Sequence, residues 1–289
     1  MLFDWTTLLA AFGGGLFAAA IGTLPSFVFT GVLVLVGAAV AASGGGTEML
    51  THVAFGPVFG PHIAFGGGAA ATAYAHRRGL IPSGRDIALP LMGVGRPDVL
   101  IIGGCFGMLG YLLNAGWQFA GLGPRTDTIA MTVVVSAMVA RLVFGRTPLA
   151  SRRFRPNEKS NWVRHQERPT QFVTIGLGVG LLSAFVALTF GADRGGDVLG
   201  FGIAAASLVF AQFGLKVPVT HHMALPAAVA ALATGDLVVG TTFGIVGACA
   251  GEGFSRVFHQ HGDTHIDPPA AGIAITVALI RIIWPVAPM

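Results

Sequence analysis

Long apolar segments recur along the whole chain, and they limit the possible folds more than any other feature. A helix needs about 20 mostly apolar residues to cross a bilayer. Only 10% of the 289 residues are charged, whereas roughly a quarter are charged in a soluble domain. We therefore expect an integral membrane protein, and neither a water-soluble globule nor a nucleic-acid-binding protein. The ten candidate spans are residues 5–22, 26–43, 61–76, 98–118, 127–145, 171–190, 198–213, 219–234, 237–257 and 269–287.

The bilayer also determines the secondary structure of these spans. Its core holds no water that could bind free backbone groups, so a spanning segment is a helix or part of a closed barrel. The segments are too long for barrel strands. We predict an all-α polytopic membrane protein of about ten transmembrane helices, some of them broken or re-entrant.

Basic residues predict the orientation, because Lys and Arg accumulate in cytoplasmic loops. The longest polar stretch lies at 147–169 and is strongly basic, so we expect it to be cytoplasmic. With five spans on each side of this stretch, 14 of the 17 Lys and Arg residues fall on the same side. Only Arg125, Arg194 and Arg281 fall on the other side. Both termini are then predicted to lie outside.

Four sequence matches recur in the same order in the two halves of the chain, which indicates a duplication. The matched segments are 13–20 with 178–185, 60–73 with 220–233, 106–117 with 243–254, and 127–144 with 267–284. We predict a first five-helix repeat at 1–146, a basic cytoplasmic linker at 147–169 and a second five-helix repeat at 170–289. An odd number of spans per repeat makes the two repeats inverted.

Inverted repeats predict the position of a site. In transporters built this way the substrate binds near the midplane at the repeat interface, often on discontinuous helices. The matched segments FGPVFGPHIAFGGG and FGLKVPVTHHMALP each place Gly, Pro and His inside an apolar region. His62 and His222 occupy equivalent positions there. Ionisable groups at membrane depth usually face a cavity, a partner or a pathway, although a hydrogen bond to a neighbouring helix carbonyl would also explain a histidine.

The predicted binding site consists of the residues around these two histidines, together with one acid. Glu252 is the only acid deep within a strongly apolar helix, and Arg256 follows four residues later on the same face. An intrahelical ion pair and a role in proton or ion coupling both remain open for Glu252. The candidate substrate-binding residues are Gly60, Pro61, His62, Thr220, His221, His222 and Glu252.

The segment HQHGDTHID (259–267) alternates His and Asp with other residues. Imidazole and carboxylate groups at close spacing can bind zinc, nickel or copper. A solvated polar loop is the other interpretation, and the sequence assigns no cofactor. Asp127 and Asp267 are repeat-equivalent and immediately precede apolar segments, so we interpret both as helix N-caps. The candidate metal ligands are His259, His261, Asp263 and His265.

The segment THIDPPAAGIAITVAL (264–279) resembles the HPP family of integral membrane proteins, named for a His-Pro-Pro motif before an apolar helix. The motif falls on Asp267, Pro268 and Pro269, with Asp in place of His, and the family's Gly-His position falls on His62 and His222. The resemblance implies a compact helical membrane unit, with nitrite transport as the activity of some members. The five-plus-five plan is also similar to that of urea transporters.

We therefore expect a transporter or channel for a small polar solute or an anion, which is nitrite-like by the resemblance alone. The solute would pass at the interface of the two repeats. One alternative is a membrane-embedded metal protein or enzyme that uses residues 259–267 with Glu252, and another is a structural subunit without a water-accessible cavity. The expected partners are the lipid bilayer and the solute, and the Gly-rich helix faces fit a homo-oligomer.

Overall fold

The computed structural model describes residues 4–151 and 162–285, and the regular secondary structure in this part of the chain is helical. It contains 11 α-helices and no β-strand, which confirms the all-α prediction. The first half holds α1 (Trp5–Ile21), α2 (Thr23–Ala42), α3 (Ala64–Arg77), α4 (Pro97–Phe119) and α5 (Thr128–Phe144). The second half holds α6 (Pro169–Phe190), α7 (Gly196–Ala206), α8 (Val209–Gln212), α9 (His221–Thr234), α10 (Leu237–Phe254) and α11 (Pro268–Ile283).

The helices differ from the expected spans in two ways. The expected span 198–213 is divided, because α7 ends at Ala206 and α8 begins at Val209. Irregular backbone precedes α3 and α9, as the Gly and Pro residues there indicated. A π-helical turn, Met49–Ala54, and further turns come before α3, and a segment without regular secondary structure, 215–220, comes before α9. Four helical segments are long and apolar enough to cross a membrane, judged by length and composition: α2, α4, α6 and α10 with the π-turn that follows it.

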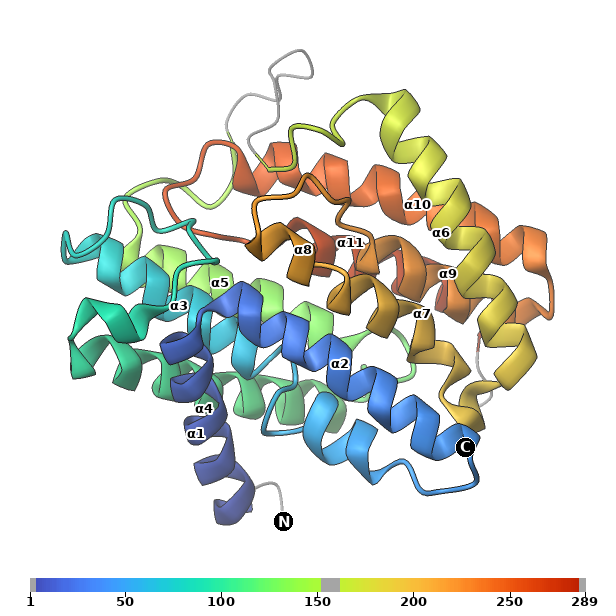
Figure 1. Cartoon of the computed structure of the whole chain (residues 1–289), viewed down its shortest axis with the longest axis horizontal. Coiled ribbons are helices and arrows are strands. Elements are labelled where there is room, and N and C mark those ends of the chain that lie inside the picture. The colour runs from blue at the N-terminus through green and yellow to red at the C-terminus, as the bar shows by residue number, and fades with distance from the viewer. Residues whose placement is uncertain (1–3, 152–161, 286–289) are drawn as a thin grey trace.

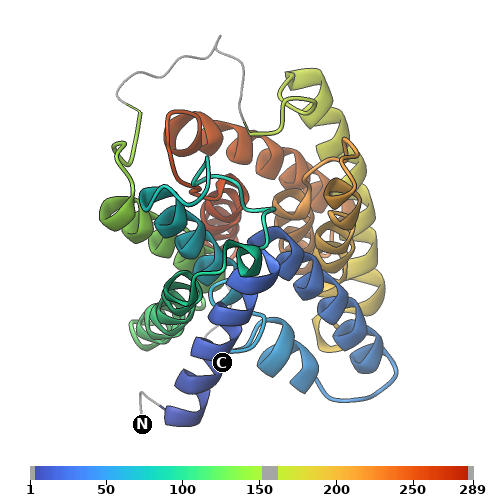
Figure 2. The ribbon, with the colours of Figure 1, turned by 60° about the vertical axis from the view of Figure 1, so that its left-hand side comes forward.

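The two halves use the same packing scheme. In the first half α4 packs against α1 and α3, and α1 also contacts α3; in the second half α10 packs against α6 and α9, and α6 also contacts α9. Figure 1 shows the first group on the left and the second on the right. The equivalent helices α1 and α6 run in opposite directions, since α1 begins at the bottom and α6 begins at the top in Figures 1 and 2.

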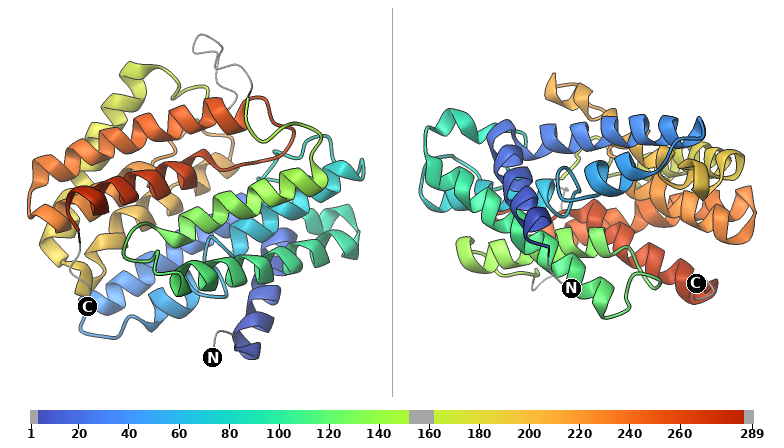
Figure 3. Two further views of the ribbon diagram at one scale, coloured as in Figure 1. Left: turned by 180° about the vertical axis from the view of Figure 1, so that it is seen from behind. Right: turned by 90° about the horizontal axis from the view of Figure 1, so that it is seen from below.

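Across the interface, two helices of the first half lie against their own counterparts. Helix α2 contacts α7, and α5 contacts α11 (Figure 3, left). Both pairs are antiparallel: Gly31 of α2 lies against Ala205 of α7, whereas Val34 lies against Gly202. The Thr126 hydroxyl just before α5 donates to the carbonyl of Ala274 within α11 at 2.7 Å. Antiparallel contact between equivalent helices is the geometry that an inverted duplication requires.

Glycines permit the closest crossing in each half. A methyl group added to Gly107 of α4 would collide with the carbonyl of Ala11 in α1. In the second half, a methyl group added to Gly180 of α6 would lie 2.7 Å from the carbonyl of Thr241 in α10. Small residues let membrane helices approach closely enough to gain dispersion energy, which the lipid does not otherwise favour.

We predict opposite effects for matched Gly→Ala substitutions within the same helix. Gly107→Ala and Gly180→Ala should lower the melting temperature, because the added methyl groups push α1 from α4 and α6 from α10. Gly116→Ala and Gly178→Ala face open space, and should leave it unchanged or raise it, since Ala favours a helix by about 0.5–1 kcal/mol over Gly. Thermal unfolding of the purified protein in detergent measures both pairs, and equal shifts would contradict the packing.

Candidate functional site

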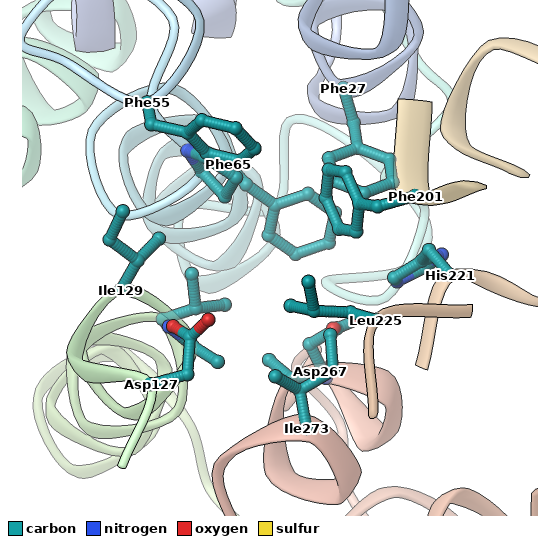
Figure 4. A pocket seen from close by; sticks show the side chains of 14 residues that line it. Phe27, Phe55, Phe65, Asp127, Ile129, Phe201, His221, Leu225, Asp267 and Ile273 are labelled. Atoms are coloured by element: carbon teal, nitrogen blue, oxygen red, sulfur yellow. The ribbon is translucent and has the colours of Figure 1, made fainter. Parts of the chain in front are cut away.

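A cavity of about 50 Å³ lies where the two halves meet (Figure 4). Most of its lining comes in repeat-equivalent pairs, although several pairs differ in residue type. Because both halves contribute the same positions, the cavity lies between the repeats and belongs to neither repeat alone. The pairs are Pro61 with His221, Phe65 with Leu225, Asp127 with Asp267, Ala130 with Ala270, and Val133 with Ile273.

Two acidic side chains, one from each half, line this cavity. Asp127 accepts a hydrogen bond from the Ala130 amide at 2.7 Å, and Asp267 accepts one from the Ala270 amide at 2.8 Å. The predicted N-caps of α5 and α11 are thereby confirmed. Both carboxylates also line the cavity, a role that the sequence analysis missed. The sequence feature that could have indicated this role is that Asp127 and Asp267 occupy equivalent positions in the two halves, each between apolar segments.

Phenylalanine rings form the opposite wall of the cavity. Figure 4 shows Phe27, Phe55, Phe65 and Phe201 on the side across from the two carboxylates. Phe27 meets Phe65 and Phe201 edge to face, in each case with ring centroids 5.8 Å apart. These rings come from α2, α3, α7 and the segment before α3, so residues distant in sequence make one aromatic wall.

His221 is the third polar residue of the lining. Its side chain is buried, its ring lies 4.7 Å from that of Phe27 between centroids, and its Nδ1 has no hydrogen-bond partner. A buried nitrogen without a partner is costly, so it marks a place where a ligand or a water molecule would be stabilised.

A wider vestibule of about 570 Å³ adjoins the cavity. Phe27, Phe65, His221 and Asp267 line both spaces. The vestibule is also lined by residues from the segments 83–87 and 162–165. These segments belong to the basic stretches 77–96 and 162–168. We call the face that carries these stretches the basic face, and the vestibule opens on it. The cavity therefore adjoins an opening on the basic face.

His62 and His222 lie next to the cavity lining and are not part of it. Their positions are equivalent in the structure, because the carbonyl of His62 packs against Gly110 and the carbonyl of His222 packs against Gly247. Both rings are buried, and the Nδ1 atom of each has no partner. The preceding residues Pro61 and His221 reach the cavity instead.

The remaining candidate binding residues have other partners. The Gly60 carbonyl accepts from the Ala64 amide at 2.9 Å and the Thr220 carbonyl from the Ala224 amide at 3.0 Å, so both residues shape the start of a helix. Glu252 forms an ion pair with Arg256 at 2.9 Å and does not line the cavity.

The structure brings two of the four candidate metal ligands together, because the rings of His259 and His265 lie 4.8 Å apart between centroids, but the four have different polar partners. His259 Nδ1 contacts the Ile266 carbonyl at 3.2 Å, whereas His261 Nε2 contacts the Pro148 carbonyl at 2.8 Å. Asp263 accepts from the Thr147 hydroxyl at 2.6 Å, and His265 Nε2 lies 3.1 Å from Asp267. Among the described residues, no three His, Cys, Asp or Glu side chains come together as a possible metal site.

Comparison with known proteins identifies the family but no activity. A model described as a family of unknown function (DUF7973) matches the chain twice, over residues 1–155 and 146–287. The chain belongs to DUF7973. Two matches to one model support a plan of two repeats. No curated protein and no solved structure matches, and the HPP resemblance is not confirmed and stays a prediction.

In this DUF7973 chain, a buried arginine holds the loop that leads into α11. Arg141 near the end of α5 is 1% exposed, and its Nε donates to the Thr264 hydroxyl at 2.9 Å. The same guanidinium also donates to the carbonyls of Thr264 and Phe258. Arg141 therefore fixes the segment just before Asp267. The equivalent residue of α11 is Arg281, which lies beside Arg125 in a separate surface hollow.

We predict that Arg141→Met destabilises the protein far more than Arg281→Met. The first change leaves buried carbonyls without a donor, which costs roughly 1–3 kcal/mol for each group. The second removes a side chain from a surface hollow. Melting temperatures of the two variants in detergent test this difference, and a shift that is as large for Arg281→Met would show that Arg141 has no special anchoring role.

Proposed function

We propose that this DUF7973 protein is a multi-pass membrane transporter that moves a small polar solute between two inverted repeats. The outer helix faces support membrane insertion, because they carry exposed large apolar side chains. Among these are Leu9, Phe17, Phe29, Leu182, Phe185, Val238 and Ile282. So many exposed large apolar side chains on the outer helix faces suit contact with lipid rather than with water.

The observation that carries the proposal is the position of the cavity. It is lined mostly by repeat-equivalent residues at the contact between the halves, which is where inverted-repeat transporters bind their substrates. The start of α11, at Asp267, and the start of α5, at Asp127, both point to this place. Helix capping alone would explain the two carboxylates, but not the internal space that they border.

The lining favours a polar solute over an anion such as nitrite. Free amide groups at a helix N-terminus are a common means of binding an anion. In α11 the first two positions are Pro268 and Pro269, which have no N–H, and the Ala270 amide is already bound to Asp267. The carboxylates themselves would also repel an anion.

The open vestibule lies on the basic face, which we propose to be cytoplasmic by the positive-inside rule. If the chain crosses the membrane five times on each side of the cytoplasmic linker, both termini lie outside. The structure would accordingly be a form open towards the cytoplasm, with the opposite side closed at the cavity.

Transport is testable in proteoliposomes with urea, nitrite and methylammonium as neutral, anionic and cationic probes. We expect flux of at least one probe above that of empty vesicles. Asp127→Asn and Asp267→Asn should lower this flux at least tenfold, because Asn still caps a helix while the cavity loses a charge. The matched control is Asp236→Asn, since Asp236 caps α10 through the Val238 and Val239 amides outside the cavity.

Folded, inserted protein that passes none of the three probes would contradict the proposal. Flux that falls equally in the Asp236 variant would show that capping, and not the charge in the cavity, is what transport needs.

A further inference from the structure

We infer that the cavity between the repeats binds a small organic cation of the ammonium class. This inference rests on the proposed function, because it names the solute that the transporter would carry. It differs from the nitrite-like anion that the HPP resemblance implies, which was one of the two kinds of solute expected from the sequence. Four features of the cavity support it: charge, aromatic surface, size and an unpaired nitrogen.

The charge of the lining is negative. Asp127 and Asp267 come from opposite halves, and no Lys or Arg from the described residues lines the cavity. His265 lies 3.1 Å from Asp267 and lines the vestibule, so it approaches that carboxylate from outside the cavity. Two carboxylates that no Lys or Arg of the described residues neutralises within the cavity favour a cationic ligand.

The aromatic wall narrows the type of cation. The face of a Phe ring attracts a cation, and aromatic walls are a known means of recognising ammonium groups. Phe27, Phe65 and Phe201 face the two carboxylates across the cavity (Figure 4). A hard metal ion such as Ca²⁺ instead needs six to eight oxygen ligands, and hydrocarbon rings supply none. The combination of rings and carboxylates therefore fits an ammonium ion with alkyl groups.

The size of the cavity limits that ligand to a few atoms. Its volume is about 50 Å³, whereas one water molecule needs roughly 10–15 Å³ of such space. Methylammonium fits within this volume, whereas a larger amine would extend into the adjoining vestibule. The side chain of His221 is buried, with 6% of the residue exposed, and its Nδ1 atom has no hydrogen-bond partner. In the tautomer that leaves Nδ1 unprotonated, this atom would accept a hydrogen bond from an ammonium N–H group.

Calorimetric titration of the detergent-purified full chain with methylammonium chloride tests the inference without requiring transport. We expect saturable binding that acetate does not reproduce when it is titrated as the sodium salt. Phe201→Leu, which keeps an apolar side chain but removes the ring, and Asp267→Asn should each weaken binding at least tenfold. The matched controls are Asp236→Asn and Phe243→Leu, because Phe243 is a buried ring that packs against Trp284 away from the cavity.

Absence of binding to folded wild-type protein would overturn the inference, and so would equal losses in the cavity and control variants. The outcome is separable from that of the proposed function. Flux of urea or nitrite that methylammonium does not inhibit would reject the ammonium site and leave a transporter. Binding with the expected variant pattern but without flux of any probe would support the site and reject transport.

Discussion

The antiparallel contact between α5 and α11 is the constraint on which the candidate site depends. Each helix begins with a capping aspartate, and the contact brings the two helix starts to one cavity from opposite halves. The duplication thus creates a paired site from a residue that each half needs for a local reason, the capping of its last helix.

The cavity combines groups that are unfavourable in an apolar interior. A buried carboxylate is costly unless it is hydrogen-bonded or paired. Asp127 and Asp267 recover part of that cost by accepting backbone amides and by lying at the positive end of a helix dipole. The same interactions fix their direction, so that the carboxylates face a wall of rings. Arg141 adds rigidity, because it binds the segment before Asp267 from within α5.

Much of the helical plan was predictable from the sequence, because apolar length and Gly and Pro positions act locally. The starts of α3 and α9 beside Pro61 and His221 are examples, and so is the capping role of Asp127. The division at Ala206 was missed, since the apolar run continues through it. The sequence located the two segments that form the site but gave His62 and His222 the central role. The side-chain directions at the start of each helix place the preceding residues, Pro61 and His221, in the cavity instead. The aromatic wall could not be predicted, because its members are distant in sequence and look like ordinary apolar residues.

The most direct test asks whether a solute passes the cavity between the halves. In a background with Cys105→Ser and Cys249→Ser, Ala130→Cys and Ala270→Cys place one thiol in each half at equivalent cavity positions. We predict that a small water-soluble thiol reagent modifies each variant in proteoliposomes, and that modification stops solute flux. Unmodified thiols in a transporting protein, or flux that persists after full modification, would contradict a route between the two repeats.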